Sequence, residues 1–260
     1  MVIYYLQNPF QILPLPLPFL LLALIGAFGP SFAALIVTGK YEGRKGIKKL
    51  LSRWLIWKVG IRWYISIPLI TIGIRLGAIG LYVLTANVNP QVNIGLWYMF
   101  FIDFLIAIVG GPIAEETGWR GYALPKMQKT RNAITASLII GVLWTFWHTP
   151  GFLIPGMALP AVPLDWLVVL NYLLRVTSIT VLMTWLFNNT KESIFVAFLF
   201  HVALNSVPQT LFRIFNFGAA TTDVILWMNW FTVGLQWFAV AILIAVFGSA
   251  RLSRKSIAIR

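Results

Sequence analysis

Long apolar segments separated by short polar ones run along this chain. We place seven of them, near residues 17–38, 63–84, 96–115, 133–154, 164–187, 193–211 and 224–248. A helix needs about 20 predominantly apolar residues to cross roughly 30 Å of hydrocarbon, and each segment reaches or approaches this length. The pattern predicts an all-α fold, a polytopic transmembrane helix bundle with about seven spans.

The composition supports a membrane location. Hydrophobic residues make up 59% of the chain and charged residues only 10%, whereas about a quarter of the residues in a soluble domain are charged. A single core cannot hide so much apolar surface, but lipid can serve as a second solvent. The 12 Trp and 8 Tyr residues suit the two membrane–water interfaces. Cysteine is absent, which removes disulfides and cysteine-ligated metals.

The net charge of +13 comes from basic residues that cluster between the apolar segments. They are Lys40, Arg44, Lys45, Lys48, Lys49, Arg53, Lys58 and Arg62, then Lys126, Lys129 and Arg131, then Lys191, and finally Arg251, Arg254, Lys255 and Arg260. By the positive-inside rule, we expect the N-terminus outside and the C-terminus in the cytoplasm. The pattern suits anionic lipid headgroups, and no nucleic-acid partner is expected. The expected location is the plasma membrane of a prokaryote.

Two segments near the N-terminus need separate interpretation. Residues 40–62 are too basic to span a membrane, yet they carry Leu50, Trp54 and Trp57. They are typical of an amphipathic helix that lies on the inner leaflet and contacts anionic lipids. Residues 17–38 follow no basic region and contain no cleavage site of small residues, so we interpret them as a retained helix and not as a signal peptide.

A few polar residues lie where the pattern predicts membrane. Two acids stand together in the sequence Gly110-Gly111-Pro112-Ile113-Ala114-Glu115-Glu116-Thr117-Gly118-Trp119-Arg120. Charged groups at membrane depth cost about 3 kcal/mol or more, so they face a cavity or a partner. Glu116 and Arg120 are four residues apart and can pair on one helix face. Glu115 is rotated by about 100° and lacks that partner, which makes it a candidate general base.

Both histidines of the chain also lie in apolar runs. His201 and Asn205 are four residues apart, so they present two polar groups to one point. An Asn side chain can orient water or donate to an oxyanion. His148 would bring a third polar group from another helix. Each feature also has a structural explanation, as an ion pair at a helix end, an interhelical hydrogen bond or an interfacial residue. Their joint placement in membrane segments favours one shared aqueous site.

Three further charges fall within predicted spans. Asp103 and Arg75 lie on neighbouring predicted helices, and we expect them to pair with each other or to line a cavity. Arg175 has no obvious partner in the sequence.

Three motifs in this sequence resemble the signature of a known family. They are Glu115-Glu116-x-x-x-Arg120, Trp144-x-x-x-His148 and His201-x-x-x-Asn205. They resemble the CPBP family of CAAX proteases and bacteriocin-processing enzymes, also called Abi proteins, which includes the type II CAAX prenyl endopeptidase. The second motif usually begins with Phe, where Trp144 stands here, and an aromatic packing role survives that change. We expect a single integral membrane domain over 1–260, with the motifs in a core over 85–210.

The resemblance implies an intramembrane endopeptidase acting on a peptide or a membrane protein. In such an enzyme the residue matching Glu115 activates a water, and Glu116 and Arg120 hold the water and the carboxylate in place. His148 matches the histidine of the second motif, and His201 with Asn205 matches the group assigned to the oxyanion site. Competing interpretations are a non-catalytic membrane scaffold or bacteriocin-immunity protein, and a small transporter with a proton relay.

Two questions remain open at this point: whether a metal takes part, and whether His148 lies at the same depth as Glu115 and His201. Glu115, His148 and His201 could form a three-ligand Zn site, but the resemblance favours a water activated by glutamate with no cofactor. Counting about 1.5 Å per residue from the cytoplasmic ends, Glu115 and His201 lie about 10–15 Å deep and His148 beyond 20 Å. They can meet only if residues 121–132 dip into the membrane or the fourth helix tilts strongly.

Overall fold

The computed structural model describes residues 25–109, 111–152, 165–218 and 222–254. Its elements in chain order are α3 (Gly29–Ser52), the 3₁₀ helix η1 (Arg53–Leu55), α4 (Ile61–Ala86), β1 (Gln91–Val92), the 3₁₀ helix η2 (Ile94–Tyr98), α5 (Met99–Val109), α6 (Pro112–Glu116), the π-helix η3 (Thr117–Ala123), α7 (Leu124–Met127), α8 (Ala133–Trp147), α9 (Thr149–Phe152), α10 (Trp166–Asn189), α11 (Ile194–Ile214), β2 (Phe215–Asn216) and α12 (Thr222–Phe247).

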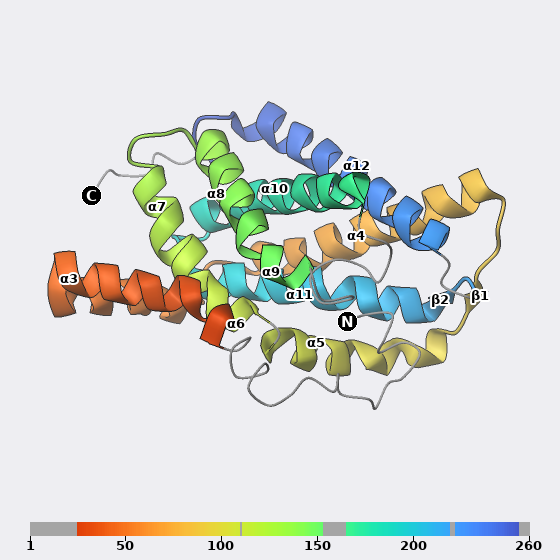
Figure 1. Cartoon of the computed structure of the whole chain (residues 1–260), viewed down its shortest axis with the longest axis horizontal. Helices are drawn as coiled ribbons and strands as arrows, with labels where there is room; N and C mark the ends of the chain where they lie inside the picture. Colours follow the sequence, from red (N-terminus) through yellow and green to blue (C-terminus); the bar gives the residue numbers. More distant parts are fainter. Residues whose placement is uncertain (1–24, 110, 153–164, 219–221, 255–260) are drawn as a thin grey trace.

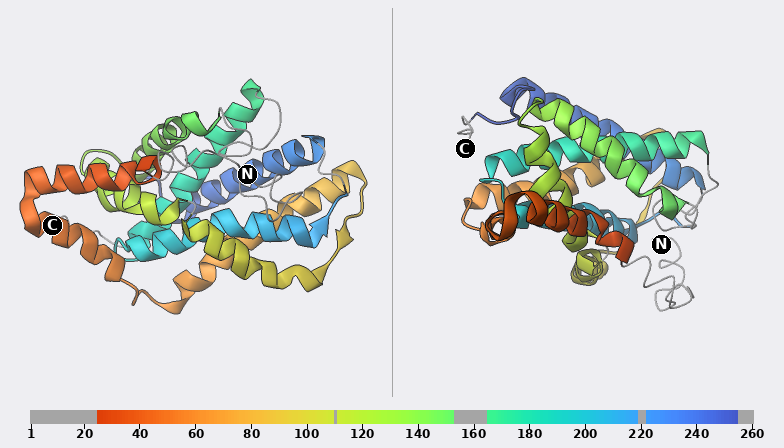
Figure 2. Two further views of the ribbon diagram at one scale, coloured as in Figure 1. Left: turned by 60° about the horizontal axis from the view of Figure 1, so that its bottom comes forward. Right: turned by 60° about the vertical axis from the view of Figure 1, so that its left-hand side comes forward.

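Helices α10 and α11 form the centre of the bundle (Figures 1 and 2). Helix α11 packs against α4, α5 and α10, and helix α10 packs against α8 and α12 as well. Of the 18 most apolar consecutive residues, 61% are buried in each of these two helices, but only 33% in α4 and 22% in α12. The outer helices therefore present most of their apolar side chains to the surroundings.

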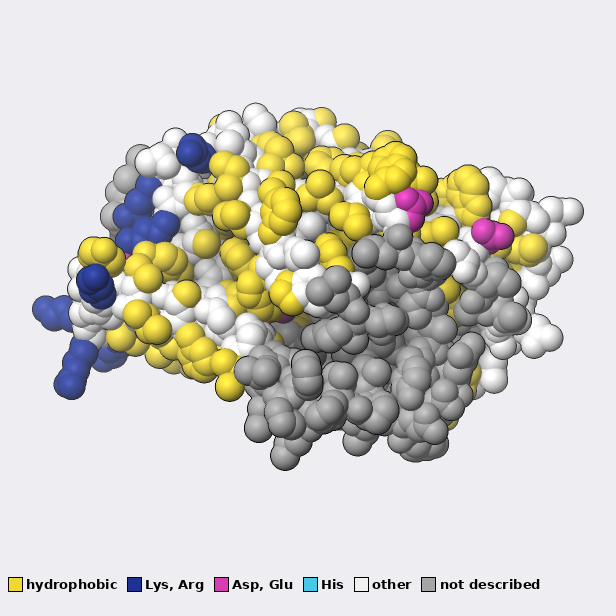
Figure 3. All heavy atoms as spheres, in the orientation of Figure 1, with side chains coloured by type: hydrophobic (Ala, Val, Ile, Leu, Met, Phe, Trp, Pro, Cys, Tyr) yellow, Lys and Arg dark blue, Asp and Glu magenta, His cyan; other side chains and the backbone are white. Residues whose placement is uncertain are grey.

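Large apolar side chains cover the outside of the bundle. Exposed examples come from four helices: Leu69 on α4, Leu105 on α5, Phe146 on α8 and Phe238 on α12. Figure 3 shows such side chains spread over the visible face between the two ends. An apolar belt of this kind matches hydrocarbon better than water.

Within the described residues, five helical segments are long and apolar enough to cross a membrane. They are Ile61–Ala86, Ile94–Met127, Trp166–Asn189, Ile194–Ile214 and Thr222–Phe247, and Ala133–Trp147 is a shorter apolar helix. The predicted all-helical polytopic bundle is confirmed, whereas the count of seven spans is not. The predicted first span begins at residue 17, and its first part lies outside the described residues.

Side-chain caps mark where two of the helices begin, and another helix contains an internal proline. The Asn132 side chain accepts a hydrogen bond from the Thr135 N–H at 2.7 Å and so caps α8. Ser193 caps α11 in the same way. Pro68 lies inside α4 and cannot donate the helical hydrogen bond that the Tyr64 carbonyl would otherwise accept. Membrane helices tolerate such a proline because local adjustments can satisfy the freed group.

The predicted end of the third span at residue 115, and the loop over 116–132, are wrong. The chain stays helical through η3 and α7 to Met127. Pro125 lies in α7 directly after the π-helix, and the helical stretch continues past it. The change of direction occurs only at residues 128–132.

The sequence predicted a separate amphipathic helix over residues 40–62, and the structure shows that this prediction is wrong. Helix α3 runs from Gly29 to Ser52 and so joins the predicted first span to the basic residues, with a kink at Gly43 where φ is +64°. Helix η1 follows, and residues 56–60 are not helical. After the kink the helix is amphipathic, but this amphipathic part is shorter than predicted.

Basic residues gather at one end of the molecule, the left end in Figure 3. Contacts between loops hold this end together. The Lys191 ammonium donates to the Lys58 carbonyl at 3.3 Å, and the Asn188 amide donates to the Arg251 carbonyl at 2.8 Å. Regions that the charge pattern placed on one side of the membrane therefore share one end of the bundle.

A small strand pair lies at the opposite end of the bundle (Figure 1). Strands β1 and β2 pair antiparallel with Gln91 opposite Asn216. This two-residue ladder departs from the all-α prediction, and it ties the segment before α5 to the end of α11.

Candidate functional site

A break between α5 and α6 sets the position of the Glu115 side chain. Gly111 has a φ of +139°, a backbone angle that L-residues other than glycine rarely adopt. Pro112 begins α6 at a position that suits proline. A Cβ atom on Gly111 would lie 2.5 Å from Glu115 Oε1, so glycine is needed here for space as well as for the turn. Gly110 lies outside the described residues.

Glu115 is buried, with 4% of its surface exposed. Its Oε2 accepts a hydrogen bond from Trp144 Nε1 at 2.6 Å. Among the described residues, none donates a hydrogen bond to its Oε1 or forms an ion pair with it. One carboxylate oxygen is therefore fixed by the protein, and the other is available to a ligand.

Glu116 links three elements. It has no exposed surface, and its Oε1 accepts from Arg120 Nη1 at 3.0 Å and from His201 Nδ1 at 2.7 Å. The predicted pairing of Glu116 with Arg120 is thus present in the structure, and it extends across to α11. Because Nδ1 of His201 donates to Glu116, the other ring nitrogen, Nε2, is the one left to face a ligand.

Several buried polar atoms around Glu116 lack a partner. Within the described part of the chain, Glu116 Oε2, Arg120 Nε and Arg120 Nη2 form no hydrogen bond. Buried polar groups are nearly always bonded to protein or water. These atoms therefore give the site a polar lining that suits a bound water or a polar substrate group.

Trp144 contacts Glu115, Arg120 and His201. Its ring centroid lies 4.3 Å from the Arg120 guanidinium carbon and 5.1 Å from the His201 ring centroid. Its indole N–H also donates to Glu115. The motif resemblance indicated only an aromatic packing role, which understated this residue. The signal in the sequence was the replacement of Phe by Trp, because only Trp adds a hydrogen-bond donor.

His148 lies one helical turn beyond Trp144, at the end of α8. Its Nδ1 donates to the Trp144 carbonyl at 2.8 Å. Its ring packs against those of Trp147 and Tyr172, with centroids 4.8 Å and 5.7 Å away. His148 thus borders the carboxylate cluster through Trp144, and within the described part of the chain it forms no hydrogen bond with the glutamates or His201.

The depth problem raised by His148 disappears because Glu115 lies deeper than the sequence suggested. The chain remains helical beyond Glu115, so the stretch from Glu115 to Met127 and that from Ala133 to Trp144 both span about 17 Å. These two stretches meet at the bond between Glu115 and Trp144. The motifs therefore share one depth, and no separate re-entrant loop is needed.

Asn205 lies one turn beyond His201 on the continuous helix α11. Its side chain is exposed and has no hydrogen bond with the described residues. Spacing placed it correctly on the same helix face as His201, but no contact joins it to the cluster. Its role in the oxyanion site remains a prediction.

The predicted pair of Arg75 with Asp103 is wrong. Asp103 instead accepts from the Thr210 hydroxyl at 2.8 Å and from Arg213 at 3.3 Å, which links α5 to α11. Arg75 donates to the Thr232 hydroxyl at 3.4 Å on α12. The sequence could not assign these partners, because the pairing depends on which faces of α4, α5, α11 and α12 turn toward one another.

The possible zinc ligands do not converge. Among the described residues, no three His, Cys, Asp or Glu side chains are grouped so that they could hold a metal ion. His201 and His148 both use Nδ1 in hydrogen bonds within the protein, which leaves Nε2 of each ring as the nitrogen open to a ligand. Because the described side chains are not grouped around one point, the donor set does not fit the three-ligand site considered from the sequence.

Comparison with known proteins identifies the part of the chain that contains this cluster. Residues 97–207 match the family model described as type II CAAX prenyl endopeptidase Rce1-like. The CAAX prenyl protease 2 of Methanococcus maripaludis is 24% identical over 199 residues, which cover 74% of this chain and 73% of that protein. All three motifs lie in the matched range, and the family resemblance is confirmed.

Proposed function

We propose that this integral membrane protein, whose residues 97–207 match the type II CAAX prenyl endopeptidase Rce1-like family model, is an endopeptidase that hydrolyses a peptide bond with a water activated by Glu115. The observation that carries the proposal is the contrast between adjacent carboxylates. Glu116 is paired with Arg120 and His201, whereas Glu115 has only a neutral partner, Trp144.

The proposed reaction assigns a role to each member of the cluster. Glu115 Oε1 takes a proton from water, and the oxygen attacks the peptide carbonyl. The ion pair of Glu116 with Arg120 fixes His201, whose protonated ring would donate from Nδ1 to Glu116 and from Nε2 to the developing oxyanion. Asn205 would donate to the same oxygen, and His148 would orient the substrate at the edge of the site. Glu115 then returns the proton to the leaving amine.

Purified protein in detergent tests this proposal. The substrate is a fluorogenic peptide ending in a prenylated CAAX sequence, chosen because the matched relative is named a CAAX prenyl protease. Wild type is expected to cleave it, and Glu115→Gln is expected not to, while both show the same elution and melting temperature. Cleavage by folded Glu115→Gln would move the catalytic role elsewhere. If wild type does not cleave this or other membrane peptides, the scaffold or immunity function stands instead.

We also propose that the reaction needs no metal. Residues Glu116, Arg120 and His201 already supply the charges that hold the site. Treatment with a strong chelator is expected to leave the cleavage rate unchanged within about twofold. Loss of activity that returns on addition of Zn²⁺ would show that this part of the proposal is wrong.

The topology proposal rests on the clustering of basic residues at one end of the bundle (Figure 3). We propose a prokaryotic plasma-membrane protein with seven spans, an outside N-terminus and a cytoplasmic C-terminus. At this end, α3 and η1 form an open groove of about 510 Å³ lined by Arg44, Ile47, Lys48, Leu51, Ser52 and Leu55. Its mixed basic and apolar lining suits anionic lipid. Because the chain contains no cysteine, labelling of single cysteines introduced at each end of the bundle, carried out in whole cells, tests the orientation.

A further inference from the structure

The open groove of about 510 Å³ formed by α3 and η1 combines two kinds of chemistry. It is lined by two cations, Arg44 and Lys48, by the apolar side chains of Ile47, Leu51 and Leu55, and by Ser52. These positions are three or four residues apart, so they share one face of the helix beyond its kink. Leu51 and Leu55 are 43% and 78% exposed. The groove therefore offers apolar surface and positive charge to one ligand.

The two cations of the groove have no acidic partner. Two acids beside this segment already pair with other residues, Glu42 with Lys126 at 2.6 Å and Glu192 with Arg53 at 2.6 Å. Neither Arg44 nor Lys48 forms an ion pair with any residue that the structure describes. Their charges are therefore available to an anion from outside the protein.

Two residues of η1 bind the π-helix that carries Arg120. Trp54 Nε1 donates to the Thr117 hydroxyl at 2.9 Å, and Arg53 Nη1 donates to the Gly121 carbonyl at 2.6 Å. The two acceptors lie on either side of Arg120 in the sequence of η3. A π-helix is rare in proteins and commonly marks a functional site. Helix η1 therefore links the groove to the carboxylate cluster.

Close packing between α3 and η3 strengthens this link. Helix α3 lies against η3, and Leu50, next to the groove residue Leu51, is only 5% exposed. A Cβ atom on Gly121 would lie 2.9 Å from Leu50 Cδ1, so no space is left between the two helices at this point. Closely packed interiors transmit displacements. A shift of the α3 segment is therefore passed on to η3.

We propose that this groove binds one anionic phospholipid, and that the bound lipid activates the enzyme by holding η1 against η3. The inference rests on the proposed endopeptidase function and adds its regulation. The lipid phosphate binds Arg44 and Lys48, and an acyl chain lies along Ile47, Leu51 and Leu55. A free phosphate ion uses none of the apolar lining. A zwitterionic lipid brings a second cation to a site that is already positive.

The make-up of the groove explains how a lipid there acts on the cluster. Most of its lining belongs to α3, but Leu55 belongs to η1, so the groove is complete only when η1 is docked. A ligand that binds one conformation more tightly shifts the population toward it. The lipid therefore favours the state in which Arg53 and Trp54 hold η3, and with it Arg120, in place.

The test measures peptide cleavage in nanodiscs of phosphatidylcholine with and without phosphatidylglycerol. Wild type is expected to cleave about fivefold faster or more with phosphatidylglycerol, the lower end of typical coupling between two sites. Arg44→Gln with Lys48→Gln should lose this activation. Lys45→Gln with Lys49→Gln is the matched control, because it removes the same charge at the same spacing on α3 outside the groove, and it should keep the activation. Equal responses of the two double variants, or no activation of wild type, would overturn the inference.

A second pair of variants tests the link through η1. Trp54→Phe removes the hydrogen bond to Thr117 and leaves the groove residues unchanged, so it should bind the lipid but lose most of the activation. Trp57→Phe is its control, because Trp57 is 58% exposed and lies outside the groove lining. Equal activation of the two variants would contradict the link.

Amide hydrogen exchange separates this inference from the proposed activity. In the Glu115→Gln background, phosphatidylglycerol is expected to slow exchange in η3 about fivefold or more. Adding Arg44→Gln with Lys48→Gln should abolish the slowing. If wild type cleaves no peptide but the lipid still protects η3 through Arg44 and Lys48, the proposed function fails and the lipid site stands. If wild type cleaves while phosphatidylglycerol changes neither the rate nor the exchange, the lipid inference fails alone.

Discussion

Asp103 and Glu116 are both buried carboxylates paired with an arginine, but they use their oxygens differently. Asp103 bonds through both oxygens, Oδ2 to Thr210 and Oδ1 to Arg213. Glu116 bonds to two partners through Oε1 alone and leaves Oε2 without one among the described residues. The adjacent Glu115 has one bonded oxygen and no cationic hydrogen-bond partner.

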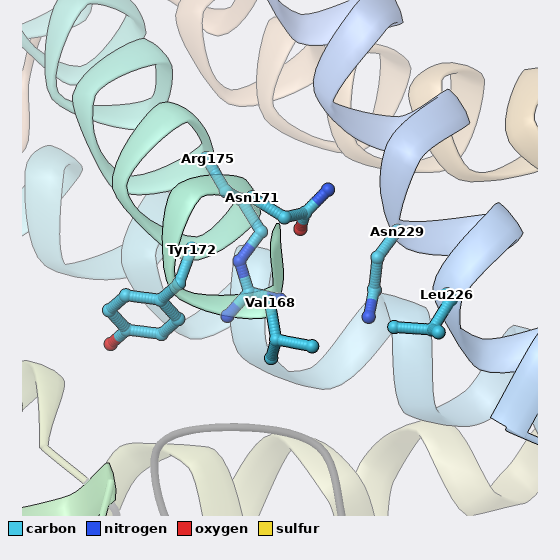
Figure 4. A pocket seen from close by; sticks show the side chains of 6 residues that line it. All are labelled: Val168, Asn171, Tyr172, Arg175, Leu226 and Asn229. Atoms are coloured by element: carbon cyan, nitrogen blue, oxygen red, sulfur yellow. The ribbon is translucent and has the colours of Figure 1, made fainter. Parts of the chain in front are cut away.

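This difference separates a pair that links two helices from a cluster that has hydrogen-bonding atoms left for a ligand. Where both carboxylate oxygens are bonded, as in Asp103, the group mainly links α5 to α11. Where bonding capacity is left over in a buried site, it either lowers stability or serves a ligand. In the cluster, Glu116 Oε2 is an acceptor without a hydrogen bond among the described residues, and Arg175 Nε, beside a small cavity between α10 and α12 (Figure 4), is a donor without one. The following substitutions test this distinction.

The largest expected effect comes from comparing Glu115→Gln with Asp103→Asn. Loss of a general base lowers kcat by about 10²- to 10⁴-fold, with little change in melting temperature. Asp103→Asn should keep kcat within about threefold and lower the free energy of unfolding by about 1–2 kcal/mol, because a bond to a charged partner is weakened. Peptide cleavage and thermal unfolding measure both. A large loss of kcat in Asp103→Asn would remove the distinction between the two sites.

Glu116→Gln should destabilise the protein more than any other single change in the cluster. It leaves Arg120 as a buried charge without its partner, which costs about 3–5 kcal/mol of the free energy of unfolding. The double variant Glu116→Leu with Arg120→Met should recover most of that stability and remain inactive. Denaturant unfolding followed by Trp fluorescence checks this. A double variant as unstable as Glu116→Gln would mean that the pair does more than neutralise charge.

Gly111→Ala should displace Glu115, and Gly80→Ala serves as its control. The φ of +139° at Gly111 and the contact with Glu115 Oε1 make the substitution cost about 1–3 kcal/mol of stability, with a loss of kcat. A Cβ on Gly80, in the middle of α4, meets nothing within 4 Å. Gly80→Ala should therefore stabilise slightly, by up to about 1 kcal/mol. Unchanged kcat in Gly111→Ala would show that the break does not position Glu115.

The smallest expected effect is that of Trp144→Phe. This change introduces the residue usual at that motif position but removes the hydrogen bond to Glu115 Oε2. We expect kcat to fall about tenfold, equivalent to about 1.4 kcal/mol, while the ring keeps its place over Arg120. Steady-state kinetics measure the change, with Trp147→Phe as the control. Equal effects of the two substitutions would assign Trp144 to packing alone.

Sequence patterns predicted most elements of the fold. The predicted spans 63–84, 164–187, 193–211 and 224–248 agree with α4, α10, α11 and α12 to within a few residues at each end. They succeeded because length and hydropathy alone determine whether a helix can cross hydrocarbon. The end of the third span was wrong, because Arg120 and the basic residues after it were taken as a loop. Hydropathy gives a charged residue the same value whether it is neutralised inside the bundle or exposed in a loop, so it could not distinguish the two cases.

The sequence supplied the candidate residues of the site but not their contacts. Helical spacing alone was enough to pair Glu116 with Arg120 and to place His201 and Asn205 on one face. The bond from Trp144 to Glu115 and that from His201 to Glu116 join separate helices. Spacing within one helix carries no information on which residue of another helix it meets.

The sequence by itself therefore determined that the chain suits a lipid environment, where most of its helices lie, and which polar residues are candidates for a site inside the membrane. Those properties follow from local composition and from the period of the helix. Only the tertiary structure decided that Asp103 pairs with Arg213 and not with Arg75, and that Arg175 faces a cavity with no acid beside it. Helix rotation and packing fix these outcomes, and they depend on all neighbouring side chains at once.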